Sequence, residues 1–111
     1  MKHLYEMHAD ICKTLANPKR IEIINTLRDK ELSTGKLLEI LKIKKANLSQ
    51  HLSVMRTKGI VKARRDGLNI FYRIANPKVI KACDIMRQVL IEHLAEANKT
   101  ANKWSKQDHE S

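Results

Sequence analysis

Apolar residues recur at helical spacing over most of the chain. Leu4, Met7, Ile11 and Leu15 lie three or four residues apart, so they share one face and predict a first helix. The same spacing predicts three more short helices, whose inward faces are formed by Ile21, Ile24 and Leu27, then by Leu37, Leu38 and Leu41, and then by Leu48, Leu52 and Met55.

Polar residues mark where these helices begin. Asn17 is a good N-cap and Pro18 suits the first helical position, so the first helix should end before Asn17 and the second should follow it. Ser33 or Thr34 can cap the third helix in the same way.

The pattern changes to strict alternation after Gly59, which predicts strands. The fourth helix, predicted over 45–58, should end at this glycine, because a left-handed residue is favoured there. Asp66 and Gly67 form a hairpin turn signal between two alternating runs. The runs are Val61, Ala63, Arg65 and Ile70, Tyr72, Ile74; a long helix follows Asn76-Pro77, with a stripe of Val79, Cys83, Met86, Leu90, Leu94 and Ala97.

Two short helices with a tight connection, followed by a hairpin, make a winged helix-turn-helix. We therefore predict one mainly α domain over 1–111, with five helices and a small two-stranded β-hairpin as the wing. The helix-turn-helix should occupy 34–59 and the wing 60–75, and residues 104–111 should form a flexible tail. In this architecture one helix enters the DNA major groove, and the hairpin places basic side chains beside phosphates.

Positive charge is concentrated in the same region. The chain has 22 Lys and Arg against 12 Asp and Glu, for a formal net charge of +10, and residues 44–73 carry +7 of it. A pI near 9.9 predicts an anionic partner, with double-stranded DNA first and an anionic membrane surface second. The alternative, that a basic surface only aids solubility, does not explain why the charge is gathered in one region.

Composition narrows the class of protein further. Mean hydropathy is −0.45 and no long apolar run occurs, so no membrane span is predicted. The N-terminus has acids where a signal peptide needs an apolar stretch, so we expect a cytoplasmic protein. Two cysteines are too few for a disulfide scaffold. An enzyme is not predicted, because the chain has no nucleophile elbow, glycine-rich phosphate loop or evident pair of catalytic acids.

Several segments, taken in order, resemble the ArsR/SmtB family of dimeric bacterial and archaeal repressors. The resemblance covers about residues 9–98 and implies a repressor that binds a palindromic operator as a homodimer and is released by an inducer. It also implies that 1–16 and 77–103 are dimerisation helices. The matching segments are Leu-Ala-Asn-Pro-Lys-Arg at 15–20, Leu-Ser-Gln-His-Leu at 48–52, Gly-Ile-Val at 59–61, Arg-Arg-Asp-Gly at 64–67 and Tyr72-Arg73.

The resemblance further implies which side chains contact DNA. Gln50 or Asn47 can pair with adenine, and Lys45 can donate to guanine. For His51 alone, a solvated surface side chain is an equally good interpretation. The positions that match the family's major-groove residues are Lys44, Lys45, Asn47, Ser49 and Gln50; those expected at phosphates are His51 and Arg56, and those on the wing are Arg64 and Arg65. A sequence-tolerant architectural DNA-binding protein is the alternative, although it accounts for the charge and not for the polar reading residues.

Candidate sensing residues lie outside the basic region. A Cys-x-Cys pair that some family members carry on the third helix is absent from residues 31–36. Cys12 and Cys83 are candidates for thiol chemistry with an oxidant, a reactive sulfur species or a thiophilic metal(loid), and Lys13 and Lys81 could lower their pKa. The alternative is that both cysteines pack as small buried hydrophobes.

A nickel-, cobalt- or zinc-type metal sensor is another alternative. His93 and Glu96 match one half of a site that family members build on the last helix, but the other half aligns with Asn76 and Lys78, and a charged lysine cannot ligate a metal. We therefore assign no definite cofactor, and a thiophilic metal(loid) or a transition metal ion stays an alternative. Further histidines near the ends of the chain are His3, His8 and His109.

Overall fold

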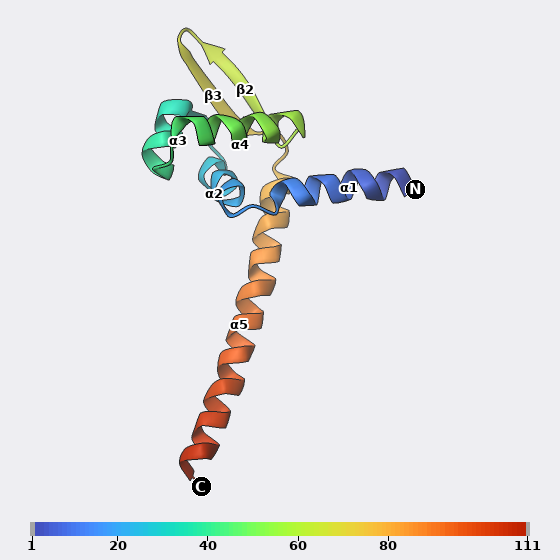
Figure 1. The fold of residues 1–111 in the computed structure, drawn as a ribbon, viewed down its shortest axis with the longest axis vertical. Helices are drawn as coiled ribbons and strands as arrows, with labels where there is room; N and C mark the ends of the chain where they lie inside the picture. Colours follow the sequence, from blue (N-terminus) through green and yellow to red (C-terminus); the bar gives the residue numbers. More distant parts are fainter. Residues whose placement is uncertain (1, 111) are drawn as a thin grey trace. The chain divides into compact units, whose positions relative to one another are not determined.

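The computed structural model describes the backbone of residues 2–110 and the side chains of residues 3–100. The chain divides into two compact units, 1–80 and 81–111, and each is described by itself. Over the described backbone the elements follow in the order α1 (Lys2–Leu15), α2 (Pro18–Leu27), β1 (Leu32–Ser33), α3 (Thr34–Leu41), α4 (Lys45–Thr57), β2 (Val61–Asp66), β3 (Asn69–Ile74) and α5 (Lys78–Glu110) (Figure 1).

Three helices begin with a side-chain cap. Asn17 Oδ1 accepts hydrogen bonds from the backbone N–H groups of Lys19 and Arg20, at 3.0 and 3.1 Å, and Pro18 follows at the first helical position. Ser33 Oγ accepts a hydrogen bond from the backbone N–H of Lys36, and Asn76 Oδ1 accepts one from the N–H of Lys78 at the start of α5. The predicted starts of these helices are therefore confirmed, together with their physical cause.

Left-handed backbone follows each of the two helices of the helix-turn-helix. Lys42, which ends α3, has φ 54° and ψ 44° and donates its N–H to the Leu38 carbonyl. Gly59, which follows α4, has φ 75°, as predicted for its position. Lys42 is exposed and is the one described non-glycine residue with positive φ, a conformation that crowds a Cβ atom.

The wing is a three-stranded antiparallel sheet with strand order β1-β3-β2, so the predicted two-stranded wing is corrected. The two long strands pair along their length, from Val61 opposite Ile74 to Asp66 opposite Asn69. The added strand is only residues 32–33, which pair with residues 71–72 of β3. Two residues are too few to show an alternating pattern, so this strand could not be predicted from the sequence.

The core of the N-terminal unit is built from aliphatic side chains, as the low aromatic content requires. One predicted member is wrong: Ile21 is 38% exposed, and Ile23 is fully buried in its place. Because α2 contacts α3 and also β3, it buries a face wider than one stripe. The fully or nearly fully buried side chains are Ile23, Ile24, Leu27, Leu37, Leu41, Leu48, Leu52, Met55, Ile60, Val61, Ile74 and Ile80.

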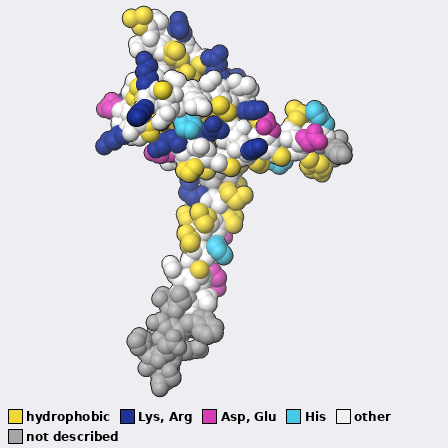
Figure 2. All heavy atoms as spheres, viewed as in Figure 1, with side chains coloured by type: hydrophobic (Ala, Val, Ile, Leu, Met, Phe, Trp, Pro, Cys, Tyr) yellow, Lys and Arg dark blue, Asp and Glu magenta, His cyan; other side chains and the backbone are white. Residues whose placement is uncertain are grey.

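Apolar side chains remain outside this core on α1 and α5. Figure 2 shows hydrophobic side chains on both helices. No helix in the described range combines the length and apolarity needed to cross a membrane. The flexible tail predicted for 104–111 lies where no side chain is described. The large apolar residues that are more than half exposed on these helices are Leu4, Tyr5 and Met7, and Ile85, Met86, Val89, Leu90, Ile91 and Leu94.

We expect Leu52→Ala to lower the free energy of unfolding by about 2–5 kcal/mol, because it removes buried methyl groups and leaves a cavity under α4. Leu68→Ala is the matched control, since Leu68 at the hairpin tip is fully exposed and should change the free energy by less than about 0.5 kcal/mol. Urea unfolding at one protein concentration measures both. Equal losses for the two variants would contradict the assigned core.

Candidate nucleic-acid interface

The two faces of α4 differ in character. Leu48, Leu52 and Met55 are buried, with at most 1% of each side chain exposed, and they fix which face of the helix points outward. His51 is half-buried. The outward residues that the sequence assigns to DNA are all exposed: Lys44, Lys45, Asn47, Ser49, Gln50 and Arg56.

The N-terminus of α4 is the helix start without a side-chain cap. Lys44 occupies the N-cap position and makes no capping hydrogen bond, and no acid lies in the first turn. The first N–H groups of a helix have no intrahelical partner and carry a positive partial charge, so Lys44 and Lys45 add like charge to this end. A helix start of this kind is unfavourable alone and is stabilised by an anion.

His51 is hydrogen-bonded to a residue of another helix. Arg20 on α2 donates from Nε to His51 Nδ1 at 3.1 Å, and it donates from Nη1 to the Thr14 carbonyl of α1 at 3.2 Å. Burial, followed by the charges of Arg20 and Lys19, holds the pKa of His51 below its usual range. His51 is therefore mainly neutral at physiological pH.

A second polar contact joins α1 to the end of α4. Lys58 Nζ donates to Asp10 Oδ2 at 2.5 Å, and about a third of the lysine side chain is exposed. Thr14, which is 5% exposed, donates its hydroxyl to the Asp10 carbonyl. The pairings of Arg20 with His51 and of Lys58 with Asp10 could not be predicted from the sequence, because their partners are 31 and 48 positions apart.

The two wing arginines have different surroundings. Arg64 donates from Nε and Nη2 to Glu31 Oε1, at 3.1 and 2.5 Å, and its guanidinium lies 4.7 Å from the centre of the Phe71 ring. The hydrogen bond from Arg64 lowers the pKa of the Glu31 carboxyl. Arg65 is exposed and makes no ion pair with any side chain in the described range. Arg64 thus links the wing to Glu31, and of these two arginines Arg65 is the one without an ion-pair partner among the described side chains.

Basic side chains gather over the N-terminal unit on the face seen in Figure 2. Lys and Arg lie along and around α4 and the hairpin, with few carboxylates among them. Such a face attracts a polyanion, and it contrasts with the hydrophobic surface on the described part of α5.

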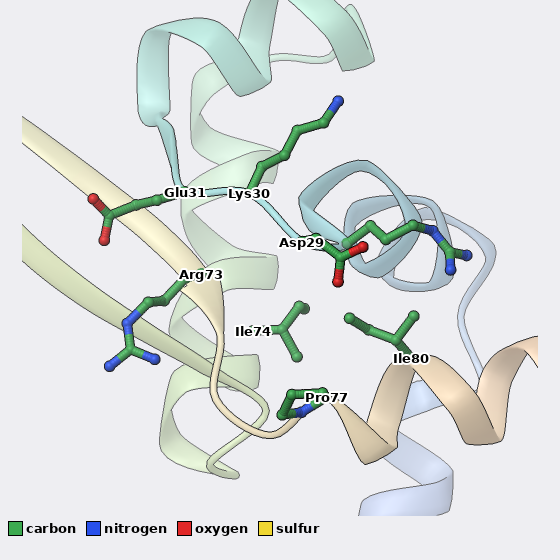
Figure 3. Close-up of a pocket in the computed structure, with 8 residues that line it drawn as sticks. Asp29, Lys30, Glu31, Arg73, Ile74, Pro77 and Ile80 are labelled. Atoms are coloured by element: carbon green, nitrogen blue, oxygen red, sulfur yellow. The ribbon is translucent and has the colours of Figure 1, made fainter.

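A pocket of about 370 Å³ lies behind the wing, between the segment that joins α2 to β1 and the end of β3. Ile74 and Ile80 point toward each other at its base, and Glu31 and Arg73 lie on the strand side (Figure 3). Its rim mixes cations with carboxylates, so it does not select a ligand of one charge. The same Glu31 holds Arg64, which ties this region to the wing.

The candidate sensing cysteines lie in different units. Cys12 on α1 is exposed, so it does not pack as a buried hydrophobe within this chain. Cys83 on α5 is half-buried, and burial raises the pKa of its thiol while nearby Arg87 opposes that effect. The basic neighbour that lowers the pKa of Cys83 is Arg87, and its effect is smaller than that of burial.

The candidate metal ligands are sparse. His93 and Glu96 are exposed on α5, and the described residues contain no cluster of three or more His, Cys, Asp or Glu that could hold a metal ion. Asn76, at the position aligned with a family ligand, uses its side-chain oxygen to cap α5. His3 and His8 are exposed on α1, and the His109 side chain lies outside the described range.

Comparison with known proteins finds relatives that are transcriptional regulators. The family model described as bacterial regulatory protein, arsR family, matches residues 17–63. An HTH-type transcriptional regulator of Mycobacterium tuberculosis, Rv0081, is 40% identical over 94 residues, which are 84% of this chain and 82% of that protein. Its crystal structure superimposes with a TM-score of 0.77 and covers 84% of this chain and 94% of that one.

Two other relatives have solved structures. The transcriptional repressor PagR of Bacillus anthracis is 44% identical over 75 residues, covering 67% of this chain and 75% of PagR, and its structure gives a TM-score of 0.68. The homodimeric winged helix-turn-helix DNA-binding domain of Mb0332 from Mycobacterium bovis is 29% identical, with a TM-score of 0.76 over 84% of this chain and 86% of that domain.

We expect the free energy of unfolding to fall as pH drops below about 6.5. The unfolded His51 takes up a proton with ordinary affinity, near pH 6.5, whereas the folded one resists until lower pH, so protons favour the unfolded state between these values. His51→Gln should lack this component, and His8→Gln, on exposed α1, should keep it. Urea unfolding between about pH 5 and 8 measures the effect, and an unchanged pH profile in His51→Gln would count against it.

Proposed function

The chain belongs to the arsR family of bacterial regulatory proteins, which are DNA-binding transcriptional regulators and not enzymes, and on this premise we propose that it is a repressor that binds a palindromic operator as a homodimer. The similarity to PagR, a transcriptional repressor, supports repression as the direction of regulation. DNA binding in turn implies that the protein acts in the cytoplasm.

The single observation that carries the proposal is the uncapped, basic N-terminus of α4. Sequences normally stabilise helix starts with polar caps and acids; α2 and α3 have a side-chain cap here, although they too lack an acid in the first turn. At α4 both preferences are broken together, and Lys44 and Lys45 are exposed. Departures from local rules are typical of functional sites, and a DNA phosphate would supply the missing acceptor and the missing negative charge.

The other assigned residues divide the work of binding. Asn47, Ser49 and Gln50 follow on the exposed side of the first two turns, where a helix in the major groove reaches base edges. Arg56 and Arg65 carry the charge for backbone contacts farther along the helix and on the wing. Arg64 is paired with Glu31, so it mainly stabilises the wing and contributes less than Arg65 to DNA binding.

A homodimer accounts for the exposed apolar stripes on α1 and α5. Large apolar residues at helical spacing and more than half exposed are the usual sign of a surface that another chain covers. The homodimeric Mb0332 domain supports the same assembly. Two copies would present two α4 helices to the two halves of a palindrome, about one helical turn of DNA apart.

An architectural protein without sequence preference is the second candidate, and the high positive charge favours it. Lys44 and Lys45 stand at the start of α4, where phosphate attraction adds affinity without selectivity. Competition binding separates the two candidates. A repressor should prefer its own promoter over random DNA by roughly 10³ or more at physiological salt, and an architectural protein should not.

Release by an inducer would act through the cysteines or through a bound metal ion. Cys12 is the more exposed thiol, and burial raises the pKa of the Cys83 thiol, so oxidation would start at Cys12. A thiophilic metal ion would instead bind both cysteines as thiolates and displace their two thiol protons, and arsenite would bind them with the loss of two water molecules. A metal sensor built on His93 and Glu96 would need ligands from a second chain, because the two residues alone do not complete a site.

We expect Gln50→Ala to reduce the preference for the operator over random DNA by roughly 5- to 150-fold, which corresponds to about 1–3 kcal/mol for a bidentate base contact. It should leave the salt dependence of binding unchanged. Arg65→Ala should do the reverse and lower the slope of log K against log salt by about 0.9 for each protomer of the bound dimer, since it removes one phosphate contact from each. Fluorescence anisotropy over a salt series measures both.

Arg64→Ala is the matched control for the wing. Because Arg64 is neutralised by Glu31, its loss should change the slope less than the loss of Arg65. A larger change with Arg64→Ala would reverse the assignment of the two arginines. Full preference in Gln50→Ala would remove this residue from base reading.

The cysteines are tested by DNA release. We expect Cys12→Ser to abolish release by diamide or arsenite, because the accessible thiol starts either reaction. Cys83→Ser should do the same if both thiols are needed. Normal release from both single variants, measured by anisotropy with the wild-type protein alongside, would end the thiol hypothesis and leave repression itself untouched.

A further inference from the structure

We propose that Arg20 is a positioning residue for DNA binding: it holds the His51 ring so that Nε2–H is its hydrogen-bond donor and faces the DNA backbone. Arg20 itself does not contact DNA in this assignment. The inference rests on the proposed function, since it names how one backbone contact of α4 is prepared. It also removes the ambiguity between a DNA contact and a solvated side chain at His51.

The tautomer of His51 follows from its hydrogen bond. A neutral imidazole has one donor nitrogen and one acceptor nitrogen. Arg20 Nε is always protonated and points at His51 Nδ1 from 3.1 Å, so Nδ1 must be the acceptor. The ring proton is therefore on Nε2, on the side of the ring away from Arg20.

The direction of that donor is fixed by the helix. His51 lies four residues after Asn47, so the two side chains are neighbours on the surface of α4. His51 is half-buried and lies at the edge of the buried face formed by Leu48, Leu52 and Met55, which leaves the free edge of the imidazole toward the outward face. A neutral N–H there can donate to a phosphate oxygen.

Arg20 is itself held at two further points. Its Nη1 donates to the Thr14 carbonyl in the last turn of α1, which is one of the carbonyls that a helix end leaves without a partner. Its own backbone N–H donates to the Asn17 cap. The guanidinium is thus fixed between α1 and α2, and it sets the ring of His51 against both helices.

The positive charges around His51 keep it in the required state. Arg20 and Lys19 from α2 both oppose protonation, and a protonated ring would lose the acceptor that Arg20 needs. The contact that results is a neutral donor, which adds a hydrogen bond without releasing a counterion. This property separates it from the contacts of lysine and arginine.

Two measurements test the proposal. In the free protein, nitrogen-15 NMR of the imidazole should show the Nε2–H tautomer for His51 in the wild type. Arg20→Met keeps the aliphatic stem and removes both donors, and it should give a mixture of tautomers with a raised His51 pKa. Lys19→Met is the matched control, since it removes a nearby charge and should leave the tautomer unchanged.

On operator DNA, Arg20→Met and His51→Ala should each weaken binding by roughly 2- to 12-fold, the range expected for one hydrogen bond. The double variant should bind no more weakly than His51→Ala, because Arg20 acts through that ring. His51→Gln should retain most of the affinity, because an amide can accept from Arg20 and donate to phosphate. The salt slope should stay constant throughout.

Other outcomes overturn the proposal in distinct ways. A salt slope lower by about 0.9 per protomer in Arg20→Met, with a further loss of affinity in the double variant, would make Arg20 a direct phosphate contact. A wild-type proton on Nδ1 would overturn it without any variant, even if Arg20→Met failed to fold. Wild-type protein that bound no DNA while showing the Nε2–H tautomer would instead contradict the proposed function and leave the positioning of the ring intact.

Discussion

Burial of one face of α4 is the constraint on which the rest of the structure depends. Leu48, Leu52 and Met55 have almost no exposed area, so the rotation of the helix about its axis is fixed by the core. The residues of α4 assigned to base reading, Asn47, Ser49 and Gln50, are exposed as a consequence. Burial also positions the wing, because Ile60 and Val61 are buried directly after α4 and fix the start of β2.

Local features were predictable from the sequence, and distant pairings were not. Helical periodicity and the Asn17-Pro18 signal depend on residues within one turn, and the structure confirms them. The exchange of Ile21 for Ile23 in the core was missed because α2 packs against more than one neighbour. A spacing rule assumes a single contact face.

In the candidate site, too, local features could be predicted from the sequence and distant pairings could not. The exposure of Lys44, Asn47 and Gln50 could be inferred from the pattern, since it mirrors the buried stripe. The pairing of Arg64 with Glu31 could not, because it depends on the short strand β1 that brings the carboxylate to the wing. The Arg20 contact was hidden for the same reason: its partners belong to the neighbouring helices.

The turn between α3 and α4 shows folding and binding competing for one residue. Lys42 ends α3 in the left-handed conformation, where glycine would relieve the crowding of Cβ by about 1 kcal/mol. Glycine would also delete an exposed cation two residues before the basic start of α4. A search for stabilising substitutions would select glycine at this position, and a search for tighter polyanion binding would select lysine. The chain has lysine here, so this turn keeps the positive charge at the cost of some stability.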